Sequence, residues 1–275
     1  MSLPPYFTGE RSTLEAFSRQ QCQAVPLTDR AILCRVLGRY LMFADADDFT
    51  VTPHMSLNGF WESWTTLAMA RQLQRGAYCV DVGANHGYFT LIMADAAGPD
   101  GHVLAIEPNP RLAQLLVHTL EVNGFEGHTA VLQKGASDAA GRPSQLVIPR
   151  HRYALGTLRR LPTGDDDSVE VETATLDEVT DTWPRVDFVK IDAEGSEEAI
   201  WRGMECLLAR NADVTVVMEL KPSGCADPAG FLGSIQAAGF RLRHIQYDST
   251  VSEVTREEIL TDRSGGDWML CLQRQ

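Results

Sequence analysis

The segment CVDVGANHGYFTL, residues 79–91, joins a short apolar run to an acid, then to two glycines four residues apart, and then to residues with helical spacing. This order predicts a buried strand, a tight turn and a helix. In open α/β sheets, ligands bind outside the carboxyl ends of the strands, where a strand meets its helix. Residues 81–87 therefore form a candidate ligand-binding turn.

The turn lacks the glycines of the common phosphate-binding motifs. A dinucleotide fingerprint would need glycine at positions 83, 85 and 88, but Asn85 and Tyr88 occupy two of them. Those glycines let the backbone approach a pyrophosphate and let the helix pack closely on the strand. The pattern therefore argues against NAD and FAD, and the Gly-Lys-Ser/Thr of a Walker phosphate loop does not follow the turn either.

Beyond this turn, β-rich runs alternate with segments of helical periodicity. We expect strands at 77–82, 102–107, 129–135, 186–192, 214–220, 240–247 and 267–274. Helices are expected in GYFTLIMADAAG, PRLAQLLVHTLEVNG, SEEAIWRGMECLLARN and PAGFLGSIQAAG. Such alternation predicts an open α/β fold with a parallel sheet covered on both faces, and the last two strands are expected to form an antiparallel pair.

Two segments depart from this alternation. Apolar residues at helical spacing in 29–43 and 60–75 predict a helical N-terminal segment, residues 1–75, that packs on a main domain of residues 76–275. Residues 136–180 contain short β-rich runs separated by Pro, Gly and the acidic GDDD. They predict an inserted meander or loop over the edge of the sheet.

Composition limits the classes of partner. The formal net charge of −13 and the lack of a dense basic run argue against nucleic acid as a partner. The six cysteines include no C-x-x-C pair, so we expect reduced thiols in a cytoplasmic protein. No signal-like start or bilayer-length apolar run occurs, so no membrane association is expected. Assembly as a homodimer stays open.

Two acids follow neighbouring expected strands. Asp81 lies where the first strand ends, and Glu107 closes the second strand in AIEPNP. Glu107 follows the glycines at about the spacing, roughly 20 residues, at which a carboxylate binds ribose hydroxyls. S-adenosylmethionine carries a ribose, an ammonium and a sulfonium but no phosphate. An acidic, phosphate-free pocket therefore suits S-adenosylmethionine as the cofactor.

The blocks VDVGANHGYFTL, IEPNP, TLDEV and DFVKIDAEGSEEAIWRG resemble the FkbM-type S-adenosylmethionine-dependent methyltransferases in order and spacing. The resemblance extends from about Trp61 to the C-terminus. It implies the Rossmann-like class I methyltransferase fold, with a seven-stranded, mostly parallel sheet whose last strand is antiparallel. It also implies methylation of a hydroxyl on a polyketide, a saccharide or another small molecule.

We expect the turn to contact the methionine part of the cofactor, with Asp81 bonded to the turn amides or else capping the following helix. Glu107 and Pro108 would hold the ribose, and the GASD turn at residues 135–138 would reach the adenine edge. Glu62 would approach the methionine end or would be a solvated helix acid. The expected cofactor-binding residues are Glu62, Asp81, Gly83, Ala84, Asn85, Gly87, Glu107, Pro108, Ser137 and Asp192.

An alcohol acceptor must lose its proton during methyl transfer, and a carboxylate within hydrogen-bond reach is the expected catalyst. Alternation along the strand in VKIDAEGSEE places Lys190 and Asp192 on one face. Asp192 is the first candidate for the catalytic base, and Glu194 is the second. Glu219 and Lys221 would line the acceptor pocket or form a structural ion pair.

The histidines have no spacing that requires catalysis or metal binding. His86 in the turn is expected to be structural, and His54, His151 and His244 could join carboxylates around a divalent metal. No metal is assigned. Alternatives to O-methylation are N-methylation, metal-assisted methylation of a sugar, and a non-catalytic module that binds the cofactor.

Overall fold

The computed structural model describes residue 7 and residues 9–158 and 162–274. Parts of two expected segments, residues 1–6 and 8 at the N-terminus and 159–161 within 136–180, lie outside the described residues. Among the described residues, the six cysteines are free thiols, and no helix has both the length and the apolar character needed to cross a bilayer.

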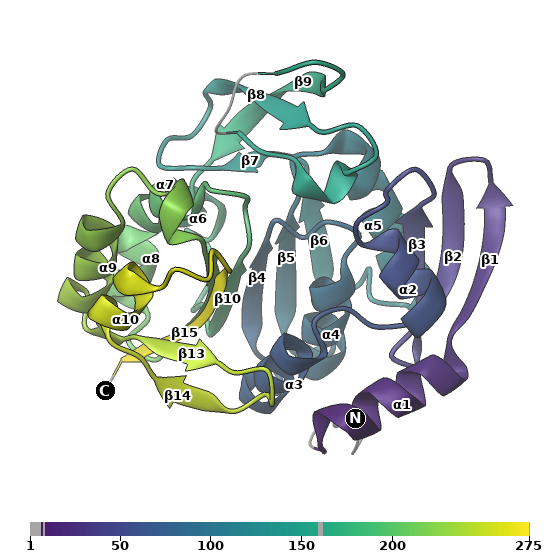
Figure 1. Ribbon diagram of the computed structural model, residues 1–275, viewed down its shortest axis with the longest axis horizontal. Helices are drawn as coiled ribbons and strands as arrows, with labels where there is room; N and C mark the ends of the chain where they lie inside the picture. The colour runs from purple at the N-terminus through teal and green to yellow at the C-terminus, as the bar shows by residue number, and fades with distance from the viewer. Residues whose placement is uncertain (1–6, 8, 159–161, 275) are drawn as a thin grey trace.

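A large sheet forms the centre of the molecule (Figure 1). Its order is β14-β13-β15-β11-β10-β4-β5-β6, with β12 also paired to β15. Strands β6, β5, β4, β10 and β11 are mutually parallel, whereas β15 is antiparallel to β11. The bounds are β4 Tyr78–Val82, β5 His102–Ile106, β6 Thr129–Leu132, β10 Phe188–Ile191, β11 Thr215–Leu220, β12 Phe240–Arg241, β13 Arg243–Ile245, β14 Val251–Glu253 and β15 Trp268–Arg274.

The mostly parallel sheet with an antiparallel last strand confirms the expected α/β fold. The described residues contain nine strands in this sheet instead of the expected seven. The expected strand 240–247 is divided into β12 and β13, and β14 adds an antiparallel edge beside β13. The expected antiparallel pairing at the end of the chain is confirmed, because His244 of β13 pairs with Leu270 of β15.

Helices cover both faces of the sheet. Along β4, Cys79 packs into one apolar cluster with Leu91, whereas Val80 and Val82 pack into a second cluster with Trp201. This alternation is the period of two expected for a strand buried on both sides. The covering helices are α4 Tyr88–Ala97, α5 Pro110–Val122, α6 Leu176–Val179, α7 Glu197–Arg202, α8 Glu205–Arg210, α9 Pro228–Ala237 and α10 Arg256–Thr261.

The local sequence explains where these helices begin and end. Asn109 caps α5 by accepting a hydrogen bond from the amide of Arg111, and Pro110 is the first residue of the helix. The expected helix in SEEAIWRGMECLLARN is divided into α7 and α8 at Gly203, where a Cβ would overlap the carbonyl oxygen of Ser137. The close approach of another backbone segment therefore interrupts the helical pattern.

The N-terminal segment corrects one expectation, because residues 29–43 are not helical. They form two strands of a separate three-stranded sheet with the order β1-β2-β3 (Figure 1). Leu37 and Gly38 both have positive φ, the pattern of the primed turns that join antiparallel strands. The segment contains α1 Arg11–Gln21, β1 Gln23–Thr28, β2 Ala31–Val36, β3 Tyr40–Asp45, α2 Thr52–Asn58 and α3 Ser63–Gln72.

The N-terminal segment packs on the main domain as expected. Cys34, Met42 and Leu67 share one buried apolar cluster with Cys79 and Leu91. The described part of 136–180 forms a small sheet with the order β7-β9-β8 that lies beyond the carboxyl ends of β4 and β5 (Figure 1). The strands of this small sheet are β7 Gly135–Ala136, β8 Pro143–Ile148 and β9 Asp167–Ala174. The 3-10 helix η2 Tyr153–Leu155 lies between β8 and β9 in the sequence.

Candidate cofactor and acceptor site

A cavity of about 700 Å³ lies at the carboxyl ends of the parallel strands. The turn after β4, the end of β5 and the loop after β10 all line it. Strand order reverses at β4, since β5 lies on one side of it and β10 on the other. The carboxyl end of such a switch point is where open α/β sheets bind ligands, so the cavity is the candidate site.

The turn after β4 owes its shape to two glycines. Gly83 has a φ of 71°, and a Cβ at this position would overlap the carbonyl oxygen of Asp192. Gly87 has a φ of 91° and packs against Leu116, so it shapes the start of α4 and is not part of the described cavity lining. Gly83, Ala84 and Asn85 do line the cavity.

Glu107 joins the end of β5 to this turn. Its carboxylate accepts hydrogen bonds from the amides of Asn85 and Asn109, both at 2.8 Å. Burial raises the pKa of Glu107 to about 7, although these two bonds favour the ionised form. Glu107 and Pro108 both line the cavity. Each carboxylate oxygen has a second lone pair that can accept a bond from a ligand hydroxyl.

Asp81 does not make the expected bonds to the turn amides. Its Oδ2 accepts a hydrogen bond from the hydroxyl of Thr90 in α4 at 2.6 Å, and the residue lies outside the described cavity lining. The alternative role, support of the following helix, fits this contact better. Burial raises the pKa of Asp81, while the nearby Lys190 and the Thr90 bond oppose that shift. Glu107 makes the turn contacts instead.

Lys190 and Asp192 lie on the same face of β10, as the alternation predicts. Lys190 Nζ donates to Asp192 Oδ2 at 3.0 Å and lies 4.6 Å from the centre of the Phe89 ring. Burial disfavours the charged ammonium, but the carboxylates of Asp192, Asp81 and Glu62 outweigh burial and raise the pKa of Lys190. Asp192 keeps 23% of its side chain exposed and lines the cavity, so it can reach a bound molecule.

Glu219, at the end of β11, lies beside Asp192. The negative charge of Asp192, followed by burial, raises the pKa of Glu219 well above its ordinary value. Of two carboxyl groups at such close range, one keeps its proton more readily, and the raised pKa makes that group Glu219. Lys221 pairs with Asp267 at 3.3 Å, and Glu219 and Lys221 both line the cavity, which is the first of the two alternatives for this pair.

Glu62 and Glu194 add two more carboxyl groups to the cavity wall. Glu62 precedes α3 at a φ of 34°, and its Oε2 is buried with no hydrogen-bond partner among the described residues. Burial and the charge of Asp192 raise the pKa of Glu62 to about 7, and the same two causes raise that of Glu194 to about 7. Glu62 is therefore not the solvated helix acid of the alternative interpretation.

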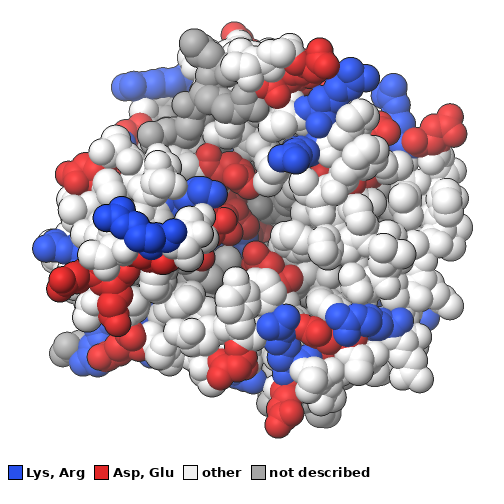
Figure 2. Space-filling model, viewed as in Figure 1, with Lys and Arg blue, Asp and Glu red and all other residues white. Residues whose placement is uncertain are grey.

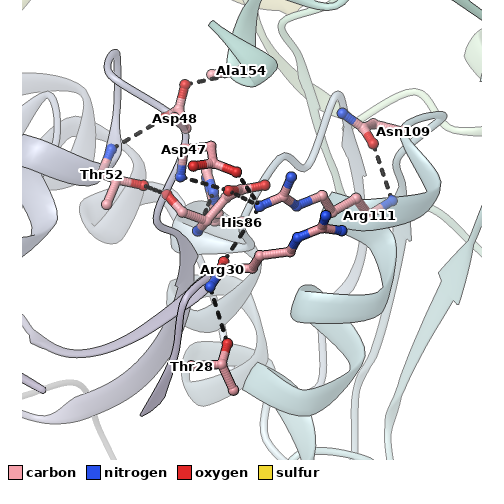
Figure 3. A network of polar contacts seen from close by, with 10 residues as sticks. Thr28, Arg30, Asp47, Asp48, Thr52, His86, Asn109, Arg111 and Ala154 are labelled. Carbon is pink, nitrogen blue, oxygen red and sulfur yellow. Dashed lines mark hydrogen bonds and ion pairs between the residues drawn. The ribbon is translucent and has the colours of Figure 1, made fainter. Parts of the chain in front are cut away.

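His86 connects the turn to the N-terminal sheet. Its Nε2 accepts a hydrogen bond from the amide of Asp45 at 3.1 Å, and burial lowers its pKa to about 4. Arg111 of α5 donates to Asp45 at 2.5 Å and to Asp47 at 3.1 Å (Figure 3). His86 therefore makes a structural contact, as expected, but its partners could not be predicted from the sequence.

The segment of residues 149–158, here called the covering segment, lies over the cavity, and its residues 153–158 line it. Hydrogen bonds attach it to three parts of the site. The carbonyl of Ala154 accepts from the Asn85 side chain at 3.4 Å. The amide of Ala154 donates to Asp48 at 3.5 Å (Figure 3). Thr157 donates to the carbonyl of Glu194 at 2.8 Å.

The remaining sequence-predicted residues lie elsewhere. Ser137 is not part of the described lining, although its neighbour Ala136 is. His54, His151 and His244 contact aromatic rings, those of Trp61, Phe49 and Trp268 in that order. No group of three or more His, Cys, Asp or Glu side chains within the described ranges is arranged to hold a metal ion.

Some lining residues were not found from the sequence. Asp267 immediately precedes β15, and its position as an acid at the start of the expected strand 267–274 was the available signal. Trp61, Tyr88 and Tyr153 line the cavity as well. They come from three separate parts of the fold, so only tertiary packing brings them together.

Comparisons with known proteins identify a family for this chain. A family model described as the methyltransferase FkbM domain matches residues 81–242. The chain is 28% identical over 184 residues to methyltransferase sdnD of Sordaria araneosa, covering 55% of this chain and 70% of that protein. It is 36% identical over 67 residues to a protein-L-isoaspartate O-methyltransferase of Ignicoccus hospitalis, covering 24% of this chain and 32% of that protein.

This second match therefore spans about a third of the length of the isoaspartate enzyme. Among solved structures, methyltransferase FkbM from Methylobacillus flagellatus KT superposes with a TM-score of 0.44 at 15% identity. That superposition covers 77% of this chain and 54% of the other.

Proposed function

The chain belongs to the FkbM methyltransferase family, and from this membership we propose that it transfers a methyl group from S-adenosylmethionine to a hydroxyl oxygen of a small molecule or saccharide. The observation that carries the proposal is the position of Asp192. Its partly exposed carboxylate faces the cavity and is paired with a buried lysine.

The cavity residues fit this cofactor. The free lone pairs of Glu107 would accept the ribose hydroxyls, and Gly83, Ala84 and Asn85 would follow the methionine portion along the turn. The buried Oε2 of Glu62 lacks a hydrogen-bond partner among the described residues, so it is available to the cationic amino group. When bound, S-adenosylmethionine supplies an electrophilic methyl group and a leaving group that departs as a neutral thioether.

The chain's own residues would position the acceptor and take its proton. Asp192 Oδ1 would accept the proton of the acceptor hydroxyl, because Oδ2 is already bonded to Lys190. Lys190 fixes the orientation of the carboxylate and compensates its charge. General base catalysis of this kind contributes roughly 10²–10⁴-fold. Glu194 would be the second candidate for the base.

The test is the variant Asp192→Asn. Labelled methyl uptake is measured with a panel of saccharides and polyketide alcohols, and calorimetry measures the affinity for S-adenosylhomocysteine. We expect cofactor-product affinity within a few fold of wild type and turnover lower by roughly 10²–10⁴-fold.

Asp213→Asn is the matched control, because Asp213 is exposed and precedes β11 at the opposite end of the sheet. Unchanged turnover in Asp192→Asn would remove Asp192 from the chemistry. A wild-type protein that binds S-adenosylhomocysteine but methylates no member of the panel would favour the non-catalytic binding module.

A further inference from the structure

A second cavity, also of about 700 Å³, adjoins the first. Glu62, Glu219 and Asp267 line both cavities, so the two meet at these carboxyl groups. The second cavity extends from this junction between α3, β13, β15 and α10. The turn after β4 and Glu107 line the first cavity alone. A molecule in the second cavity would therefore reach the Asp192 region without displacing the cofactor.

The charge of the second cavity is uniformly negative. Its described lining contains five acids and no lysine or arginine. The acids are Glu62, Glu219, Glu258, Asp262 and Asp267. Figure 2 shows one face of the molecule, with acidic side chains gathered in a hollow near its middle. A cavity lined by one sign of charge raises the local concentration of ligands of the opposite sign.

The first cavity also carries more negative than positive charge. Its described lining contains seven acids but only two lysines. Lys190 pairs with Asp192, and Lys221 pairs with Asp267. The cationic end of S-adenosylmethionine would balance Glu62. Glu219 has no cationic partner among the described residues, and the negative charge around it makes this carboxyl group retain a proton. A cation bound beside it would stabilise its ionised form.

Aromatic side chains complete the second cavity. Trp64 and Tyr247 meet edge to face at 4.9 Å between ring centres, and Trp268 packs against His244 at 4.7 Å. The guanidinium of Arg11 lies 5.1 Å from the centre of the Trp64 ring, which shows that a cation is already held against this cluster. Aromatic faces attract ammonium groups, and acids beside them add to that attraction.

We propose that the methyl acceptor carries a protonated amine, which binds beside Glu219 and Asp267 where the cavities meet, while the rest of the acceptor occupies the second cavity. This proposal rests on the proposed function. The acceptor class is a hydroxylated amine, such as an amino sugar. The ammonium is the group that anchors the acceptor, and a neighbouring hydroxyl is the group that receives the methyl.

The test compares ligands that differ in charge and little else. Glucosamine, N-acetylglucosamine and glucose are titrated into the full chain saturated with S-adenosylhomocysteine, and binding is followed by calorimetry. We expect glucosamine to bind at least about tenfold more tightly than either neutral sugar, because one desolvated charge pair is worth a factor of that order or more.

Three variants test where glucosamine binds. Asp267→Asn should lower the affinity for glucosamine about tenfold and leave the affinities for the neutral sugars unchanged. Glu258→Gln should weaken it less, and the glutamine can still cap α10, because Gln serves in a capping box. Glu126→Gln is the matched control, since it removes one exposed acid outside both cavity linings.

Different results would contradict this proposal and the proposed function. Equal affinity for the three sugars, no saturable binding of any of them, or an equal loss in Glu126→Gln would overturn the amine proposal. Failure of the same samples to bind S-adenosylhomocysteine would instead overturn the proposed function.

Discussion

Gly83 lies where two backbone segments come into contact. The carbonyl oxygen of Asp192 occupies the place of a Cβ at position 83, and the residue also has positive φ. Asp192 carries the candidate base, so this contact sets the distance between the turn after β4 and the loop that contains this candidate. A side chain at position 83 would separate them.

Gly83→Ala is therefore expected to destabilise the protein by about 3 kcal/mol or more, through strain at positive φ together with a backbone clash. Gly124→Ala is the control, because Gly124 has a φ of 72° and no atom within 4 Å of an added Cβ. The control should lose only about 1 kcal/mol. Urea unfolding measures the loss of unfolding free energy in both variants. Equal losses would show that the clash with the Asp192 carbonyl does not destabilise Gly83→Ala.

The residue types of the site were predictable, but their contacts were not. Asp81 and Glu107 both follow from strand ends in the sequence. Which of the two meets the turn amides depends on side-chain reach, because Glu107 extends from the neighbouring strand to Asn85 while Asp81 faces Thr90 of α4. That distinction needs the relative position of β4 and β5.

At the scale of elements, a buried ion pair fastens the N-terminal sheet to α5. Asp45 of β3 is fully buried and pairs with Arg111, which also lies 5.0 Å from the ring centre of Tyr153 in the covering segment. The backbone amide of Asp45 meanwhile bonds to His86 of the cofactor turn. These contacts join four parts of the chain: β3, α5, the covering segment and the turn after β4.

Arg111→Gln should destabilise the protein by about 3–5 kcal/mol, because it leaves the Asp45 carboxyl buried without its cation. Adding Asp45→Asn should recover part of that loss, which a double-mutant cycle measures. Arg150→Gln is the control, since Arg150 and Asp165 form an exposed pair at 3.9 Å and should contribute little. Additive losses for Arg111 and Asp45 would contradict the coupling.

Helices and strands were predicted correctly where the apolar residues follow a single period, and wrongly where they fit both a helical and a strand period. In 29–43 the apolar residues satisfy helical spacing, yet the buried residues Cys34 and Val36, and then Tyr40 and Met42, alternate as in strands. The Leu37–Gly38 turn was the available signal for a hairpin. The small β7-β9-β8 sheet was anticipated in outline, because Pro and Gly divide 136–180 into short runs.

At the scale of the whole molecule, burial of many carboxyl groups at one end of the sheet makes stability depend on pH. The pKa values of Glu62, Glu107 and Glu194 are each about 7 in the folded protein, against an ordinary value of 4.5. The folded state thus binds more protons than the unfolded state between these values. The free energy of unfolding should fall as pH rises through that window.

His86 acts in the opposite direction but at lower pH. Its pKa of about 4, against an ordinary 6.5, makes the folded state bind fewer protons between these values, so its contribution is lost as pH falls below 6.5. From pH 6.5 to 8 the carboxyl groups dominate. The melting temperature of the ligand-free protein should therefore decrease by several degrees over this range.

Differential scanning calorimetry at steps between pH 6.5 and 8 measures this decrease, and Glu62→Gln should reduce it because one of the titrating groups is removed. Glu126→Gln, an exposed control, should leave the slope unchanged. A melting temperature that rises with pH across this range would contradict the assignment.

The covering segment has one further consequence, which concerns how long a product stays bound. Its attachments to Asn85, Asp48 and Glu194 are single hydrogen bonds, and none of them belongs to the pairing of the large sheet. Such contacts can open on the microsecond-to-millisecond scale while the strands stay paired. We expect the spent thioether to leave through this opening without unfolding of the large sheet, and the rate at which the segment opens would then set an upper limit on turnover.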